Sequence, residues 1–120
     1  MLGEDGRVAS PLLTVHREQI GPTVVVHAVG DVDLATVGQL SEALSEATLA
    51  PGVEGVVANL SGVGFLGSAG LSALVVARNE AQKAALPFTV VAEGAARRAL
   101  ALTMLDSTLT VADRLEDVVG

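Results

Sequence analysis

One short stretch of the sequence, Val63 to Gly70, holds the residues whose types and spacing could do chemistry. It reads VGFLGSAG, and counted from Gly62 its glycines follow the GxGxxG spacing of a dinucleotide-binding loop. The stretch also holds one serine, Ser68, where a strand is expected to give way to a helix. Three chemistries fit these letters: a cradle for cofactor phosphates, a nucleophilic serine, or a hydroxyl that itself receives a phosphate.

A nucleotide-binding loop would use Gly62, Gly64 and Gly67. A strand before the motif and a helix after it favour this interpretation, because the glycines then form the turn that meets the pyrophosphate. However, Phe65 and Leu66 place bulk where the phosphates must approach. Two strands and a helix already precede the motif, so little chain remains for a second nucleotide-binding half. A small nucleotide-binding α/β protein is therefore the alternative from a different functional class.

A catalytic serine is disfavoured by the residues around Ser68. The hydrolase elbow needs G-x-S-x-G, but Leu66 stands two positions before the serine. His16 and His27 both precede the serine and lie in expected strands, against the order serine, acid, histidine of that fold. A P-loop fails as well, because Ser68 occupies the position of its lysine. The sequence predicts no catalytic residue and no enzymatic activity.

Composition limits the partners that this chain can have. Its 120 residues, half of them apolar, are enough for one domain with an aliphatic core. A net charge of −7 argues against nucleic acid and anionic membranes, since both bind basic surfaces. There is no cysteine, and both histidines lie in apolar segments, so we expect no disulfide, metal site or cofactor. The absence of a secretory signal or an apolar run of about 20 residues predicts a soluble cytoplasmic protein.

Hydrophobic periodicity and turn signals give the expected order of elements. Residues 12–17 and 23–29, separated by Gly21-Pro22, predict an antiparallel hairpin. Further strands are expected over 53–60, 88–92 and 108–111, and helices over 34–47, 68–86, 95–104 and 114–119. The pattern predicts an α/β fold, with a mostly parallel sheet of about five strands, an antiparallel first strand, and about four covering helices. Residues 1–10 are expected to form a flexible tail, and 11–120 a single domain.

The junctions between strands and helices hold the candidate polar residues. Asp33, or Thr36 together with Gln39 in a capping box, is expected to begin the first helix. Ser68 is expected at the N-terminal end of the second helix, where it would either cap the helix or present an exposed hydroxyl. We expect Phe65 and Leu66 to be the buried part of the loop before it.

Two segments and the order of elements resemble the STAS-domain family, and within it the bacterial anti-sigma factor antagonists. The first segment is GDVD at Gly30 to Asp33, and the second is NLSGVGFLGSAGL at Asn59 to Leu71. The resemblance extends over nearly the whole chain. In the family, a partner kinase phosphorylates the first serine at the start of the second helix, and that serine corresponds to Ser68.

The resemblance implies a STAS fold and an anti-sigma factor antagonist that binds an anti-sigma factor, itself a serine kinase. Such binding releases a sigma factor for transcription, and phosphorylation of Ser68 would switch it off. The implied partner-binding residues are Asp31, Asp33, Thr36, Gly67, Ser68, Ala69 and Gly70. Gly67 and Ala69 depart from the family, which usually has Asp and then Ser or Thr there. A STAS module of another signalling or transport assembly, without Ser68 phosphorylation, is the alternative within the family, and the sequence leaves open a homodimer.

Overall fold

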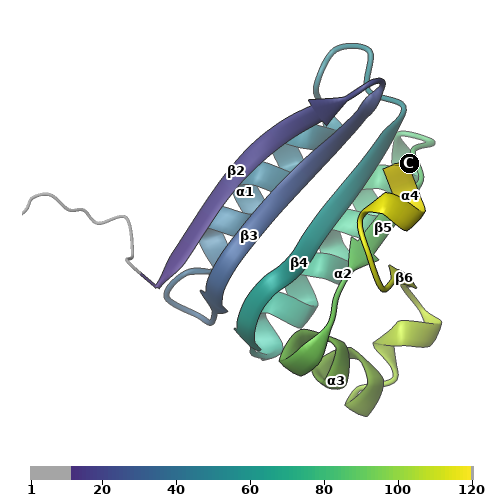
Figure 1. The fold of residues 1–120 in the computed structure, drawn as a ribbon. Helices are drawn as coiled ribbons and strands as arrows, with labels where there is room; N and C mark the ends of the chain where they lie inside the picture. Colours follow the sequence, from purple (N-terminus) through teal and green to yellow (C-terminus); the bar gives the residue numbers. More distant parts are fainter. Residues whose placement is uncertain (1–11, 120) are drawn as a thin grey trace, which may run out of the picture.

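The computed structural model describes residues 12–119, so the tail expected over residues 1–10 lies outside the described residues. Five strands form one sheet in the order β2-β3-β4-β5-β6 (Figure 1). The strands are β2 (Leu13–Ile20), β3 (Thr23–Val32), β4 (Gly55–Leu66), β5 (Phe88–Val91) and β6 (Thr110–Ala112). β2 and β3 are antiparallel, and every other neighbouring pair is parallel. The predicted sheet, with its antiparallel first strand, is confirmed.

The helices connect the strands and cover the sheet unevenly. They are α1 (Val37–Thr48), α2 (Ser68–Lys83), α3 (Gly94–Leu102) and α4 (Glu116–Val119), with a short 3₁₀ helix η1 (Leu105–Ser107) between α3 and β6. Figure 1 shows α1 and α2 behind the sheet and α4 in front of it. Within residues 12–119, no helix has the length and apolar character needed to cross a membrane.

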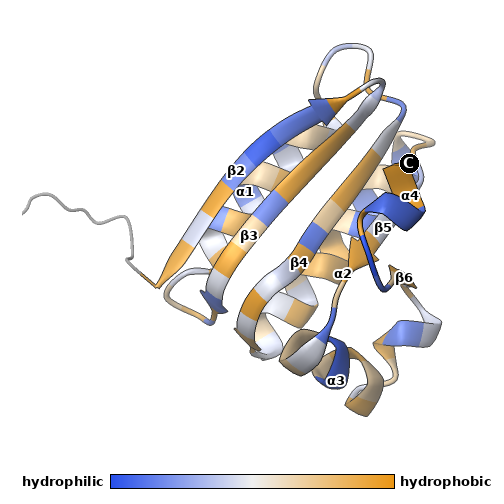
Figure 2. Ribbon diagram, in the orientation of Figure 1, coloured by the Kyte–Doolittle hydropathy of each residue, from blue (hydrophilic) through white to orange (hydrophobic). Residues whose placement is uncertain are grey.

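The main core lies between the sheet and the helices behind it. Val26 of β3, Ala58 of β4 and Leu74 of α2 are among its fully buried members. A smaller cluster on the other face packs Val25 and Val57 against α4 and the end of the chain. The two clusters arise because successive side chains of a strand point to opposite faces, and Figure 2 shows hydrophobic and hydrophilic bands along β3 and β4.

β3 and β4 run further than the sequence predicted, and this corrects the expected loop before α2. The two strands stay paired to their ends, with Val29 opposite Gly62 and Val32 opposite Leu66. Leu66 is buried as expected, but Phe65 is 52% exposed. Gly62 fits because a Cβ there would lie 2.9 Å from Cγ2 of Val29, so this glycine marks a close neighbour within a strand.

The extension of β4 also removes the turn that a nucleotide-binding loop requires. Gly62 and Gly64 both lie inside β4, and only Gly67 stands between the strand and α2. The three glycines therefore do not share one turn at the N-terminus of a helix, which is the arrangement that would hold a pyrophosphate. The nucleotide-binding interpretation lacks its structural context.

Candidate functional site

Ser68 is the first residue of α2, as the sequence predicted, and it is exposed. Gly67 stands in the N-cap position with extended backbone, φ −85° and ψ −179°, and the Gly67 carbonyl accepts the Leu71 N–H at 3.0 Å. The Ser68 side chain makes no capping hydrogen bond and has no hydrogen-bond partner among the described residues. The serine hydroxyl therefore faces solvent at the point where the helix begins.

Two close contacts hold the start of α2 against the ends of β3 and β4. The Gly67 N–H donates to the Val32 carbonyl at 2.9 Å. A Cβ on Gly70 would lie 2.6 Å from Cδ1 of Leu66 and 2.7 Å from Cγ1 of Val32, so a residue without a side chain is needed for this packing. Gly70 is consequently buried and packs the helix onto the sheet, while its contact with a partner stays a prediction.

The turn between β3 and α1 is organised by Asp33 and Thr36. One Asp33 carboxylate oxygen, Oδ1, accepts the N–H groups of Ala35 at 2.9 Å and Thr36 at 3.0 Å. Thr36 Oγ1 accepts the Asp33 N–H at 2.9 Å and donates to the Asp31 carbonyl at 2.8 Å. The predicted capping box is not formed, because Thr36 uses its hydroxyl within the turn and α1 begins at Val37. Thr36 is fully buried within the turn, and its contact with a partner stays a prediction.

This turn and the start of α2 together line one hollow. Its volume is about 470 Å³, and it is bordered by Asp33, Leu34, Phe65, Gly67, Ser68, Ala69 and Ser72. Four of the predicted partner-binding residues, Asp33, Gly67, Ser68 and Ala69, are thus brought together. Asp31 is not part of this lining: its Oδ1 lies beside Gly64, 3.7 Å from where a Cβ would stand.

The rim of this hollow is apolar, which the sequence did not indicate. Leu34 is 85% exposed and Phe65 is 52% exposed. A Cβ on Gly67 would lie 3.1 Å from Cε2 of Phe65, so the phenyl ring rests over the glycine. The absence of a side chain at position 67 therefore lets the ring lie this close to the backbone.

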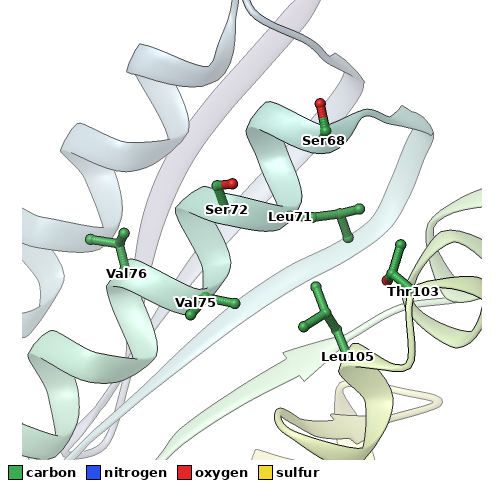
Figure 3. Close-up of a pocket in the computed structure, with 7 residues that line it drawn as sticks. All are labelled: Ser68, Leu71, Ser72, Val75, Val76, Thr103 and Leu105. Carbon is green, nitrogen blue, oxygen red and sulfur yellow. The ribbon is translucent and has the colours of Figure 1, made fainter.

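A second hollow lies on the other side of Ser68, between α2 and η1 (Figure 3). Its volume is about 490 Å³, and it is lined by Ser68, Leu71, Ser72, Val75, Val76, Thr103 and Leu105. Ser68 and Ser72 border both hollows, so this part of α2 forms a ridge between them. Sequence reasoning missed this hollow because η1 follows Met104, which has the unusual φ of +61°, and no residue pattern signalled that turn.

The chemistry of the two hollows is that of a contact surface. Asp33 is their one ionisable lining residue, and no histidine, lysine or arginine borders either of them. Residues 12–119 contain no group of three histidine, cysteine or acidic side chains placed to hold a metal ion. The site presents an exposed hydroxyl, one carboxylate and several exposed apolar side chains, a combination typical of protein–protein contact surfaces.

Comparison with known proteins gives four relevant similarities. Residues 14–118 match the family model described as STAS domain. Anti-sigma-F factor antagonist RsfB of Mycobacterium tuberculosis is 38% identical over 89 residues, 73% of this chain and 71% of that protein. The crystal structure of an anti-sigma factor antagonist from Mycobacterium paratuberculosis superposes with a TM-score of 0.81 at 33% identity, over 92% of this chain and 94% of that one. The phosphorylated form of Bacillus SpoIIAA shares the fold, with a TM-score of 0.66 at 20% identity over 88% and 96%.

Proposed function

The chain belongs to the STAS-domain family, and from that premise we propose that it is an anti-sigma factor antagonist. It binds an anti-sigma factor and thereby releases a sigma factor for transcription. The observation that carries the proposal is the free hydroxyl of Ser68 on a ridge between two hollows with apolar linings. Two similar proteins with this name, each more than 30% identical to the chain, support it.

The partner contacts what we call the Ser68 surface, made of Asp33, Leu34, Phe65, Gly67, Ser68, Ala69 and Ser72. Leu34 and Phe65 provide exposed apolar area, and an aromatic side chain at the centre of an interface commonly contributes much of the binding energy. Asp33 is held by its own turn, so its carboxylate is already oriented before a partner arrives. Such preorganisation lowers the entropic cost of binding.

The second part of this proposal is that the partner is a serine kinase, which phosphorylates Ser68. The first turn of α2 leaves backbone N–H groups without helical partners, and the helix dipole favours negative charge at this end. A phosphate there is therefore compatible with the folded domain. That a protein of the same fold has been solved in a phosphorylated form is consistent with this expectation.

Phosphorylation switches binding off through charge and hydration. A phosphoserine adds roughly −1.5 to −2 charges near neutral pH, next to Asp33 in the same hollow. Two unit charges about 4–8 Å apart repel by roughly 2–4 kcal/mol at an effective dielectric constant of about 20. Covering this doubly acidic site with an apolar partner would also remove water from the phosphate. The free protein keeps the phosphate hydrated, so the complex is destabilised and the fold is retained.

The test is to incubate the chain with each anti-sigma factor of its source organism and ATP, and to map phosphate by mass spectrometry. We expect one phosphate, on Ser68, which disappears in Ser68→Ala and persists in the matched variant Ser72→Ala. Phosphate on Ser72 would contradict the proposed acceptor. A stable complex without any phosphate would leave the antagonist role in place and remove the kinase control.

A STAS module of another assembly, without phosphorylation, is the second candidate, and Gly67 is the observation that favours it. The family usually has an aspartate at this position, and here the Phe65 ring occupies the space above the glycine. The same incubation separates the candidates, because this one predicts neither phosphate nor a complex with an anti-sigma factor.

A further inference from the structure

We propose that His27 of β3, with Asn59 and Ser61 of β4, forms a proton-sensitive lock on the pairing of these strands, here called the His27 lock. It holds a bulge in β4 while the His27 ring is neutral and releases it when the ring takes a second proton. The inference goes beyond the proposed function, because His27 shares a sheet face with Val25, which packs against α4, apart from the Ser68 surface.

The bulge interrupts the pairing of β3 and β4. The partner of His27 is Asn59. Two residues later in β3, Val29 pairs with Gly62, which is three residues later in β4. A bulge of this kind leaves a residue outside the regular ladder and bends the strand. The Asn59 side chain spans the bulge, because its Oδ1 accepts the N–H of Ser61 at 3.2 Å. This contact holds the backbone where the regular ladder is interrupted.

The direction of the hydrogen bonds assigns the proton of the His27 ring. The Ser61 N–H can only donate, so the oxygen of the Asn59 amide must face it. The Asn59 nitrogen Nδ2 then donates to His27 Nδ1, 2.9 Å away, and Nδ1 carries no proton. The ring proton is therefore on Nε2, which donates to Glu18 Oε1 at 2.8 Å. The lock in this form requires a neutral His27.

A second proton on the ring is incompatible with this arrangement. A protonated histidine has an N–H at both ring nitrogens, so Nδ1–H of His27 and the NH2 group of Asn59 would face each other as two donors. Rotation of the amide restores an acceptor for His27 but turns the NH2 group towards the Ser61 N–H. In either arrangement one contact of the lock is lost. Because histidine commonly changes its charge between about pH 5 and 8, the lock responds to pH in this range.

β2 supplies the titratable side chains in contact with His27. Glu18 is bound to Nε2–H whether or not a proton is added at Nδ1, so this contact persists in both states. His16 stacks on His27 with ring centroids 4.7 Å apart, and two charged rings at that distance would repel each other. Arg17 stands between His16 and Glu18 in the sequence and therefore points to the opposite face of the sheet.

The other elements near His27 leave the Nδ1 side of the ring without a charged neighbour among the described residues. β4 and β5 contain no ionisable side chain. Asp31 lies four residues further along β3, at the end of the strand. α4 packs apolar side chains onto this face, while its acids Glu116 and Asp117 are exposed. The effect of a proton at Nδ1 therefore falls on the neutral amide and its contact with the bulge.

The test follows the ring nitrogens of His27 by nitrogen NMR at about pH 8 and about pH 5. The hydrogen-exchange protection of the Ser61 amide is measured at the same two pH values and corrected for the intrinsic effect of pH on exchange. We expect the neutral Nε2–H form at the higher pH. At the lower pH we expect a doubly protonated ring and a protection of Ser61 that is lower by about threefold or more. The amide of Ala58, before the bulge in β4, serves as the internal reference and should keep its protection.

Three variants separate the lock from other effects of acid. His27→Gln can accept from Asn59 and donate to Glu18 but takes up no proton, so the protection of Ser61 should be equal at both pH values. Asn59→Asp presents an acceptor to both of its neighbours, so its contact with Ser61 should survive protonation of His27. His16→Gln removes the stacked ring and should respond to pH as the wild type does. Circular dichroism checks that each variant is folded.

Four results would overturn the inference. An Nδ1–H form at the higher pH would contradict the proton assignment, and a ring that stays neutral at the lower pH would remove the response. Equal protection of Ser61 in the neutral and protonated wild type would show that the bulge is not released. A response that persists in His27→Gln would assign it to another group. All four measurements use the chain alone, so their failure and that of the proposed function are distinguishable.

Discussion

Two polar regions of this molecule differ in how their hydrogen-bonding groups are used. On the sheet face away from α1 and α2, the His27 ring is held on both sides: Nε2 lies 2.8 Å from Glu18 Oε1, and Nδ1 lies 2.9 Å from Asn59 Nδ2. The ring of His16 stacks on His27 with centroids 4.7 Å apart. At the start of α2, by contrast, the Ser68 hydroxyl has no partner among the described residues.

The difference separates polar side chains that stabilise the fold from a polar side chain that is available to a partner. The side chains around His27 satisfy one another and so stabilise the pairing of β2, β3 and β4. The Ser68 hydroxyl forms no hydrogen bond with any described residue, and its neighbours Leu34 and Phe65 are exposed. A free hydroxyl among exposed apolar side chains stabilises the folded chain little, and its hydrogen bonds become useful only in a complex. Substitutions in the two regions should therefore affect different measurements.

Gly70→Val should have the largest effect, because it displaces the whole Ser68 surface. A Cβ at this position already meets Leu66 and Val32 within 2.7 Å, and the two further methyl groups cannot be accommodated. We expect a loss of about 3 kcal/mol in the free energy of unfolding, measured with urea, together with loss of partner binding. The matched variant Gly38→Val, where a Cβ meets nothing within 4 Å, should change stability by only about 0.5 kcal/mol.

Phe65→Ala should weaken partner binding while leaving the fold stable. The ring is half exposed, so its removal should lower the free energy of unfolding by less than about 1 kcal/mol. As an aromatic anchor in the interface, it should contribute about 2 kcal/mol, a roughly 30-fold change in Kd by calorimetry. Unchanged affinity would place the partner elsewhere on the molecule.

Asn59→Ala, on the sheet face, should lower stability and leave partner binding unchanged, the opposite of Phe65→Ala. The Asn59 side chain donates to His27 Nδ1 at 2.9 Å and accepts the Ser61 N–H at 3.2 Å. Its loss should cost about 1–2 kcal/mol of stability in urea unfolding and leave partner affinity unchanged. Ser61→Ala keeps the backbone N–H and serves as the control, with no measurable change expected. An Asn59→Ala variant that binds its partner more weakly would show that the two regions are not independent.

The sequence predicted the strands and helices better than it predicted which side chains of the Ser68 surface are exposed. Periodicity and the Gly21-Pro22 turn were sufficient for the hairpin and the parallel sheet, and the strand-to-helix junction located Ser68. The exposure of Phe65 could not be predicted, because apolar residues are usually read as buried although much of a folded surface is apolar. The extent of β4 depended on pairing with β3 across Gly62, which is a tertiary contact.

The residues predicted to bind the partner also show what the sequence alone could not predict, namely which of them are exposed. Thr36 and Gly70 belong to the same motifs as Asp33 and Ser68, so the sequence could not separate them. Burial distinguishes them: Thr36 bonds the turn to the end of β3, and Gly70 packs α2 onto the sheet. Both support the surface from beneath it.

Gly67→Asp should have the smallest effect. It tests what the chain gains from having glycine where the family usually has aspartate. An aspartate would press on the Phe65 ring, because a Cβ already lies 3.1 Å from Cε2. The ring can turn towards solvent, so we expect a loss of stability below about 1 kcal/mol. Partner affinity should fall by about threefold, since the ring leaves its place in the Ser68 surface. Gly67→Asn, which has nearly the same shape and no charge, shows how much of the change is steric.

The most direct test of the central claim compares the Kd of the anti-sigma factor for the unphosphorylated chain and for the chain phosphorylated on Ser68. The account predicts that phosphorylation weakens binding by about 30-fold or more, while the free energy of unfolding changes by less than about 1 kcal/mol. Ser68→Ala treated with kinase and ATP should bind as it did before treatment. Equal Kd values for the two forms of the wild-type chain would contradict the account.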